Sequence, residues 1–183
     1  AAGKSERFKK KKNKLSKQFF KVNGVSPLEH LMTSVSNNPL INSITLVINK
    51  DDRQEIEGFK KKYHKLNSVI NGGVTRQQST FIALKSIRKK RVKTKNDIVL
   101  IHDAARPFLE NRIIKSCISQ LKKYEGVFPA LDMDDTLRNK KNLNPYDRDI
   151  IIGSQTPQAF KFDKIYMAYQ KIKGIYSDDI AIA

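Results

Sequence analysis

The sequence has no tryptophan, one cysteine and few acidic residues: 18 Asp and Glu stand against 36 Lys and Arg, giving a formal net charge of +18 at pH 7. Because Cys117 has no partner cysteine, an internal disulfide is excluded, and no group of Cys and His has the spacing of a structural zinc site. No apolar run approaches the roughly 20 residues that a membrane-spanning helix needs, and no secretory h-region is present. We therefore expect a cytoplasmic protein without a membrane segment.

Two stretches carry most of the excess positive charge. Residues 1–21 hold nine Lys or Arg against Glu6 alone, and residues 85–95 hold seven with no acidic residue. Such clusters are one mark of nucleic-acid binding, so a basic binding module without catalysis is one hypothesis. The lysines are not interleaved with the aromatic side chains of a single-strand binding platform. We favour a solvated lysine-rich surface and do not expect nucleic acid as a partner.

Stretches with a helical spacing of apolar residues alternate with short β-branched runs. They predict strands at 44–48, 68–70, 98–101 and 126–131, and helices across 27–36, 56–66, 81–87, 113–121 and 165–172. This alternation favours an α/β fold with βαβ crossovers and a mostly parallel sheet covered on both faces. Ligands bind such sheets at the carboxyl ends of the strands.

Residues 132–149 break this alternation, because they are charged, contain Asn144 and Pro145 and have no helical stripe. We predict a protruding β-arm or hairpin there. The chain begins at Ala1 without a methionine and stops at Ala183 without a turn or helix stop signal. We expect a single domain over residues 1–183, truncated at both ends.

Polar segments that follow expected strands are the candidate sites. The first is AAGKSER at 1–7 with SKQ at 16–18, where small residues let backbone N–H groups approach phosphates and fixed cations offset the charge of a transferring phosphoryl group. The second is GGVTRQQS at 72–79, where Thr75 and Gln78 fit a capping box that opens a helix beside two glycines. Free N–H groups there suit an anion or a base edge. An ordinary polar loop and a plain glycine turn stay open as interpretations.

The third segment, HDAARP at 102–107, is the most informative because it follows the apolar strand expected at 98–101. Asp103 is thereby placed at the carboxyl edge of the sheet, and a carboxylate there suits Mg²⁺. Pro107 favours an extended backbone at Arg106, whose planar guanidinium suits a phosphate. A structural Asp–Arg pair is the competing interpretation. We interpret His102 as the end of the strand.

The fourth group combines arm and C-terminal positions. It contains Asp135-Thr136 and Asp147-Arg148 in the arm, QTPQ at 155–158 and SDD at 177–179. Hydroxyls and an arginine are what a phosphorylated polyol needs, although each segment alone could be a turn.

In this order the four groups resemble the 2-C-methyl-D-erythritol 4-phosphate cytidylyltransferase family, which activates methylerythritol phosphate with CTP in non-mevalonate isoprenoid synthesis. The resemblance spans essentially all 183 residues, and HDAARP and QTPQ are its specific motifs. It implies a nucleotidyltransferase that transfers CMP to methylerythritol phosphate with Mg²⁺ or another divalent cation, releasing pyrophosphate and forming 4-diphosphocytidyl-2-C-methyl-D-erythritol. It also implies a Rossmann-like three-layer α/β sandwich whose arm at 132–149 joins a homodimer.

The resemblance assigns a role to each candidate residue. It implies catalytic roles for Arg7 and Lys17 and a metal-binding role for Asp103. The implied nucleotide-binding residues are Ala2, Gly3, Gly72, Gly73, Ser79 and Ala104, and the implied acceptor-binding residues are Arg106, Thr136, Arg148, Thr156 and Ser177. In such a reaction the acceptor's own phosphate attacks; it is largely dianionic at pH 7 because its second pKa is about 6, so no general base is needed.

Some positions depart from the family pattern. Ser5 stands where the family has a second glycine, Ser16 where it has a proline and Ser177 where threonine is common. Because we expect the chain to be truncated, we expect the family's first strand, before Ala1, and its C-terminal strand, with a late lysine, to fall outside these 183 residues. Three alternatives stay open: the acceptor is ribitol 5-phosphate, the chain is the front part of a protein fused to a cyclodiphosphate synthase, or it is a non-catalytic basic α/β module that binds nucleic acid.

Overall fold

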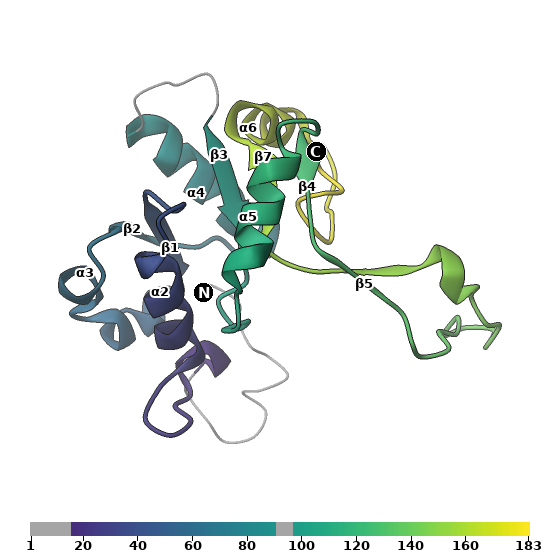
Figure 1. The fold of residues 1–183 in the computed structure, drawn as a ribbon, viewed down its shortest axis with the longest axis horizontal. Coiled ribbons are helices and arrows are strands. Elements are labelled where there is room, and N and C mark those ends of the chain that lie inside the picture. The colour runs from purple at the N-terminus through teal and green to yellow at the C-terminus, as the bar shows by residue number, and fades with distance from the viewer. Residues whose placement is uncertain (1–15, 91–96) are drawn as a thin grey trace.

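The computed structural model describes residues 16–90 and 97–183, so Ala2, Gly3 and Arg7 lie outside the described residues. The helices are α2 (Pro27–Asn37), α3 (Phe59–Lys62), α4 (Arg76–Lys90), α5 (Asn111–Gln120) and α6 (Phe162–Lys171). The strands are β1 (Ile44–Ile48), β2 (Leu66–Asn71), β3 (Ile98–Ile101), β4 (Gly126–Val127), β5 (Ala130–Asp132), β6 (Ile152–Ser154) and β7 (Gln158–Lys161). Short 3-10 turns are η1 (Lys17–Phe19), η2 (Lys50–Asp52), η3 (Gln54–Ile56) and η4 (Arg148–Ile150). Helices and strands alternate along the chain as far as α5, and β4 to β7 then follow one another before α6 (Figure 1).

The described strands form three hydrogen-bonded groups. β1 and β2 are parallel, as the sequence predicts. β7 lies between β3 and β4 and runs antiparallel to both. The sequence analysis did not predict β7, because its four residues, QAFK, contain no β-branched side chain that would mark a strand.

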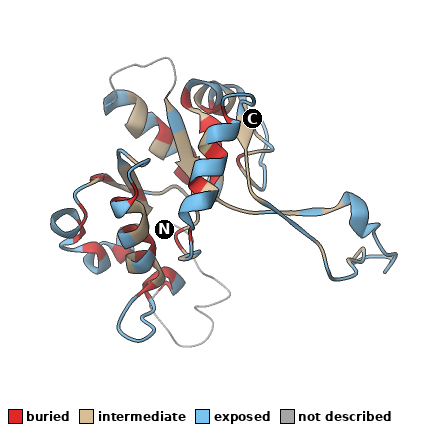
Figure 2. Ribbon diagram, in the orientation of Figure 1, coloured by how far each residue is buried: buried red, intermediate tan, exposed pale blue. Residues whose placement is uncertain are grey.

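Helices cover both faces of β3. Leu100 packs against a cluster that contains Ile114 of α5 and Leu31 of α2. The neighbouring Val99 points to the opposite face and packs in a cluster with α4 and α6 side chains. Figure 2 shows buried positions along the sides of the helices that meet the strands. The expected three-layer α/β arrangement is confirmed.

Helix α2 begins where its sequence dictates. Pro27 occupies the first turn, where a missing N–H costs nothing, and the Ser26 hydroxyl accepts a hydrogen bond from the Glu29 N–H. The Glu29 carboxylate accepts in return from the Ser26 N–H, which completes a capping box. This hydrogen bond is the main reason that the pKa of Glu29 is lowered.

The helix expected across 56–66 is wrong. Only α3, a four-residue helix, forms there, and β2 already begins at Leu66. Gly58 adopts a φ of 82°, in the left-handed region, which no α-helix can continue through. The apolar spacing still buries Ile56, Phe59 and Tyr63, in the core cluster that contains β1 and α2 residues.

The single strand expected at 126–131 is also wrong. β4 ends at Val127 and pairs with β7, whereas β5 begins at Ala130 and pairs with β6. Pro129 separates them and cannot donate to a ladder. The chain therefore leaves the body between β4 and β5.

Residues from β5 to β6 run out from the body as a long extension (Figure 1). The two strands pair antiparallel at its base, and an isolated bridge joins Arg138 to Pro145 further out. Most of its side chains are exposed.

Cys117 is a buried, free thiol in the core, where it packs with Leu121 and Ala159. Burial raises the pKa of this thiol. Within the described residues no helix is both long and apolar enough to cross a membrane.

Candidate active site

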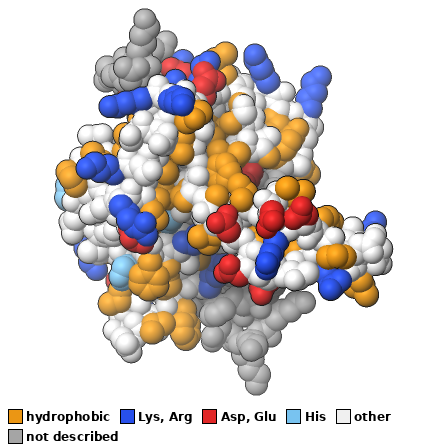
Figure 3. Space-filling view, turned by 45° about the vertical axis from the view of Figure 1, so that its right-hand side comes forward, with side chains coloured by type: hydrophobic (Ala, Val, Ile, Leu, Met, Phe, Trp, Pro, Cys, Tyr) orange, Lys and Arg blue, Asp and Glu red, His pale blue; other side chains and the backbone are white. Residues whose placement is uncertain are grey.

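A cavity of about 220 Å³ opens where the ends of β3 and β6 meet the start of α4 and the segment after α6. The side chains around it are mostly charged or polar. They are Arg76, Asp103, Arg106, Ser154, Gln155, Thr156, Gln158, Ser177 and Asp178. Figure 3 shows acidic side chains gathered, with basic side chains between them, near the place where the extension leaves the body.

Strand register brings two of the predicted segments together. Ile101 at the end of β3 faces Gln158 at the start of β7, so residues after 101 meet residues before 158. As a result, the Asp103 N–H donates to the Thr156 hydroxyl at 3.4 Å. A turn closed by the Arg106 N–H on the Asp103 carbonyl, at 3.0 Å, returns Arg106 to the same edge.

The Asp103 carboxylate lies between two arginines. Arg106 Nε is 3.4 Å from its Oδ2, and Arg76 Nε is 3.7 Å from its Oδ1. Arg106 also donates a hydrogen bond to the Gln155 side chain. The Asp103 side chain is 43% exposed and can be reached from the cavity. The paired cations and the accessible carboxylate provide both kinds of charge that a metal-bound phosphate chain requires.

A second set of polar groups fixes the C-terminal wall of the cavity. Gln158 and Ser154 donate to Asp178 Oδ2 at 3.0 and 3.2 Å, and the Ala181 N–H donates to Oδ1 at 3.0 Å. Burial acts to raise the pKa of Asp178, but these hydrogen bonds outweigh it, so the pKa is lowered. Asp178 is therefore ionised next to Ser177.

The start of α4 is tied to the segment that carries Ser177. Gln77 donates to the Gly174 carbonyl at 3.0 Å and accepts from the Tyr176 N–H at 2.9 Å. The two segments are far apart in the sequence. The Gln77 side chain, at the start of α4, nevertheless hydrogen-bonds to backbone groups of the segment that carries Ser177. Arg76 and Ser177 are thereby held on the same cavity.

The glycine loop before α4 is built on its own hydrogen bonds. The Gln78 N–H donates to the Thr75 hydroxyl at 3.0 Å, as the predicted capping box requires, but the return bond runs from Val74 N–H to Gln78 Oε1. The buried Ser79 hydroxyl accepts from the Gly73 N–H at 3.1 Å and donates to the Thr75 carbonyl at 2.8 Å. Ser79 therefore shapes the loop from behind.

Replacing Gly73 with alanine should distort this loop. A Cβ at position 73 would lie 2.6 Å from Gln78 Cβ, closer than carbon atoms can approach. We expect Gly73→Ala to lower the unfolding free energy by about 1–3 kcal/mol, the usual cost of overpacking, and to weaken CTP binding. Urea unfolding and calorimetric CTP titration measure the two effects. Equal CTP binding by Gly73→Ala and the wild type would contradict a role of this loop in nucleotide binding.

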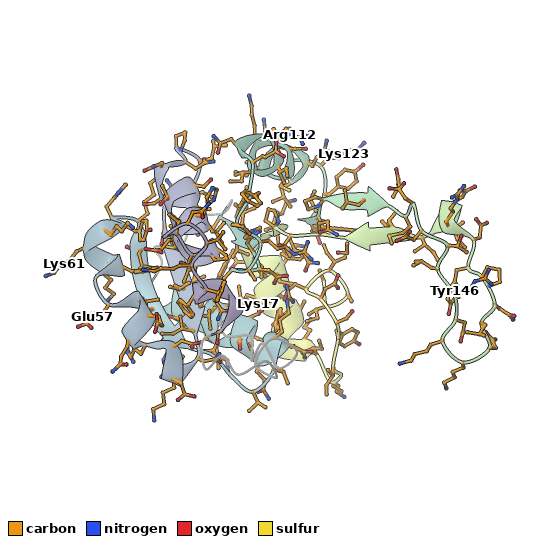
Figure 4. All side chains as sticks on the ribbon, turned by 90° about the horizontal axis from the view of Figure 1, so that it is seen from below. Lys17, Glu57, Lys61, Arg112, Lys123 and Tyr146 are labelled. Carbon is orange, nitrogen blue, oxygen red and sulfur yellow. The ribbon has the colours of Figure 1, made fainter. Side chains whose placement is uncertain are left out.

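Lys17 lies outside the residues that line the cavity. It is exposed on η1 between the buried residues Ser16 and Gln18. The Ser16 hydroxyl lies 3.2 and 3.1 Å from the two oxygens of the buried Asp52 carboxylate. Figure 4 places Lys17 on the body of the molecule and Tyr146 on the distant extension.

The structure thus brings together four of the predicted site residues: Asp103, Arg106, Thr156 and Ser177. Gly72, Gly73 and Ser79 lie in or next to the glycine loop, and Ala104, within HDAARP, is buried in the core cluster that contains β1 and α2 residues. The structure does not bring Thr136 and Arg148 to this cavity: both lie in the extension, where Arg148 donates to the Asp134 carbonyl at 3.5 Å.

Sequence reasoning missed several lining residues, above all Arg76. Its signal was its place at the start of a helix, three residues after the paired glycines. Asp178 and Gln158 stood inside the SDD and QTPQ segments but were not singled out. The role of His102 as the end of the strand agrees with its contacts, since its Nε2 lies 2.9 Å from the Arg106 carbonyl oxygen and burial lowers its pKa.

The donor set fits a metal ion that is held mainly by its substrate. Within the described part of the chain, no group of three or more His, Cys, Asp or Glu residues could form a protein-only metal centre. Mg²⁺ commonly binds through one or two carboxylates together with substrate phosphates. Asp103 provides one accessible carboxylate of this kind.

This three-layer α/β fold places a carboxylate, two arginines and hydroxyls at the ends of its strands. Such an arrangement is typical of enzymes that bind nucleotides and phosphates. The family model "IspD: 2-C-methyl-D-erythritol 4-phosphate cytidylyltransferase" matches residues 1–183. The chain belongs to this family.

Individual relatives agree with the family match. A 2-C-methyl-D-erythritol 4-phosphate cytidylyltransferase of Clostridium beijerinckii is 34% identical over 173 residues, covering 91% of this chain and 74% of the relative. The bifunctional enzyme IspD/IspF of Bartonella henselae is 36% identical over 162 residues, covering 84% of this chain and 40% of the relative. The solved 4-diphosphocytidyl-2C-methyl-D-erythritol synthase of Anaerococcus prevotii has a TM-score of 0.78 at 30% identity, covering 91% of this chain and 75% of that one.

Proposed function

We propose that this chain transfers CMP from CTP to 2-C-methyl-D-erythritol 4-phosphate, releasing pyrophosphate and forming 4-diphosphocytidyl-2-C-methyl-D-erythritol. The observation that carries the proposal is the cavity in which Asp103 stands between Arg76 and Arg106, with Thr156 and Ser177 beside them. The activity for which the family and its Clostridium beijerinckii member are named supports the choice of substrates.

The described residues suit this reaction without a general base. The acceptor's phosphate is itself the nucleophile, so the site has to align it and offset charge. Arg106, Thr156 and Ser177 provide a guanidinium and two hydroxyls for that phosphate. Asp103 would hold Mg²⁺ or another divalent cation, which neutralises the triphosphate as pyrophosphate leaves. Lys17 and Arg7 would contribute further positive charge.

The test is pyrophosphate release in the presence of Mg²⁺. CTP, ATP, GTP and UTP are each offered with methylerythritol phosphate and, separately, with ribitol 5-phosphate. Release with CTP and methylerythritol phosphate alone supports the proposal. Release with ribitol 5-phosphate alone moves the chain to the alternative acceptor, and silence together with salt-sensitive retention on nucleic acid supports the binding module.

The proposal includes a homodimer joined through the arm at 132–149. The extension carries exposed apolar side chains, which an isolated chain would leave in water: Leu131, Leu143, Tyr146, Ile150 and Ile152. Thr136 and Arg148 lie on this extension, outside the cavity lining of their own chain, and a second copy would bring them to an acceptor. The cytoplasmic location stays a prediction from the sequence.

Charging the extension should break this dimer. We expect the wild type to sediment as a dimer at micromolar concentration and Ile150→Lys to shift it to monomer, with turnover falling about tenfold or more if the partner's arm completes the site. Analytical ultracentrifugation and the pyrophosphate assay measure the two effects. Met167→Lys, on the exposed face of α6, is the matched control and should stay dimeric. A wild type that sediments as a monomer would contradict the dimer.

A further inference from the structure

Asp179 is a buried carboxylate that the proposed reaction does not use. Its side chain is 0% exposed. The Tyr169 hydroxyl donates a hydrogen bond to Oδ1, and Arg76 Nη2 lies 2.7 Å from Oδ2. Its own N–H donates to Gln158 Oε1 at 2.8 Å. A buried charge is retained only when it is paired, so Asp179 requires Arg76 in this place.

Arg76 is shared between this buried carboxylate and the accessible Asp103. Its guanidinium is 2.7 Å from Asp179 and 3.7 Å from Asp103. The closer pair is also the one shielded from water, where the same charges attract more strongly. The charge of Arg76 is therefore compensated mainly by Asp179, and Asp103 keeps its negative charge toward the cavity.

We propose that Asp179, held by Tyr169, is a positioning residue that serves as the counter-ion of Arg76 and so leaves Asp103 able to bind a divalent cation. This rests on the metal-binding role proposed for Asp103. Among the described residues that line the cavity, the charged groups besides Arg76 and Asp103 are Arg106, 3.4 Å from Asp103, and Asp178.

The protonation states fit this arrangement. Burial acts to lower the pKa of Arg76, but Asp179 and then Asp103 outweigh it, so the pKa is raised and the guanidinium stays charged. The pKa of Tyr169 is raised far above its ordinary value, first by burial and then by Asp179. Its hydroxyl therefore remains a donor over the working pH range.

The test measures cation binding directly, with Mn²⁺ as the probe and free Mn²⁺ read by electron paramagnetic resonance, with and without CTP. In Asp179→Asn the charge of Arg76 faces Asp103 alone, so we expect about tenfold weaker Mn²⁺ binding. The double variant Arg76→Gln/Asp179→Asn removes both charges and, in the measurement without CTP, should return the Mn²⁺ affinity to within about twofold of the wild type. A structural role alone would not produce this recovery.

Two variants keep the result interpretable. Asp163→Asn removes the surface ion pair of Asp163 with Arg88, at 2.7 Å between α6 and α4, and should leave Mn²⁺ binding unchanged. Tyr169→Phe retains the ring that stacks on Phe81 and removes the hydroxyl that donates to Asp179 and is also hydrogen-bonded to Thr80. It should weaken Mn²⁺ binding about threefold even if Asp179→Asn fails to fold.

The inference and the proposed function can fail separately. Unchanged Mn²⁺ binding in Asp179→Asn and Tyr169→Phe, or no recovery in the double variant, overturns the inference while normal turnover of the wild type leaves the function intact. Conversely, the expected Mn²⁺ pattern in a wild type that is silent with CTP and both acceptors supports the inference and rejects the function.

Discussion

Asp103→Asn should reduce turnover with CTP and methylerythritol phosphate by about three orders of magnitude, because it removes the charge that would hold the divalent cation against the triphosphate. The amide is nearly isosteric, and the backbone contacts of the turn do not depend on the carboxylate: the Asp103 N–H on Thr156 and the Arg106 N–H on the Asp103 carbonyl. The fold should therefore survive. Pyrophosphate release measures the rate, and circular dichroism with thermal unfolding checks the fold.

The same variant decides between the two interpretations of HDAARP. If Asp103 only pairs with Arg106, the substitution should leave the rate within about a factor of ten. Such a pair, at 3.4 Å and partly exposed, would contribute little to stability in any case. Asp163→Asn, which breaks a surface pair on α6, provides the comparison for a carboxylate that serves no chemistry.

Periodicity predicted most of the fold because the helices and the central strands have one apolar face each. α2, α5 and α6 carry stripes at helical spacing, β3 is a continuous aliphatic run, and β1 is an apolar run that contains Thr45. The errors came where local conformation overrode spacing. Gly58, in the left-handed region, prevents a helix whose apolar residues still reach the core, and Pro129 divides a run that composition alone makes continuous.

The sequence predicts which segments form the site, but not which of their side chains meet there. Polar residues after a strand indicate an edge of the sheet, and Asp103, Arg106, Thr156 and Ser177 were found on that basis together with the family resemblance. Arg76 and Asp179 form an ion pair across about a hundred residues, which no local pattern encodes. Their meeting depends on how α4 and the segment after α6 pack, and that is a tertiary property.

Lys17→Ala should lower kcat by about 10²–10³ with a smaller change in the KM for CTP, because a fixed ammonium acts most strongly on charge that develops as pyrophosphate leaves. The structure gives Lys17 a fixed backbone. Ser16 is anchored on Asp52, and Phe19 is buried in the core cluster of α2 and β1. Steady-state kinetics with CTP as the varied substrate measure both parameters.

Two neighbouring variants make the result specific to position 17. Lys21→Ala removes an exposed lysine of the same segment and should leave kcat within about twofold, so general loss of positive charge cannot account for a large effect. Ser16→Ala keeps the lysine but deprives the buried Asp52 of a donor, leaving Asn49 at 3.1 Å. Because the turn then loosens, its kcat should fall between those of the wild type and Lys17→Ala, with a lower melting temperature. If Lys17→Ala keeps a normal kcat, the charge that assists pyrophosphate departure must come from another residue, and the anchored turn at Ser16 then serves the fold and not the chemistry.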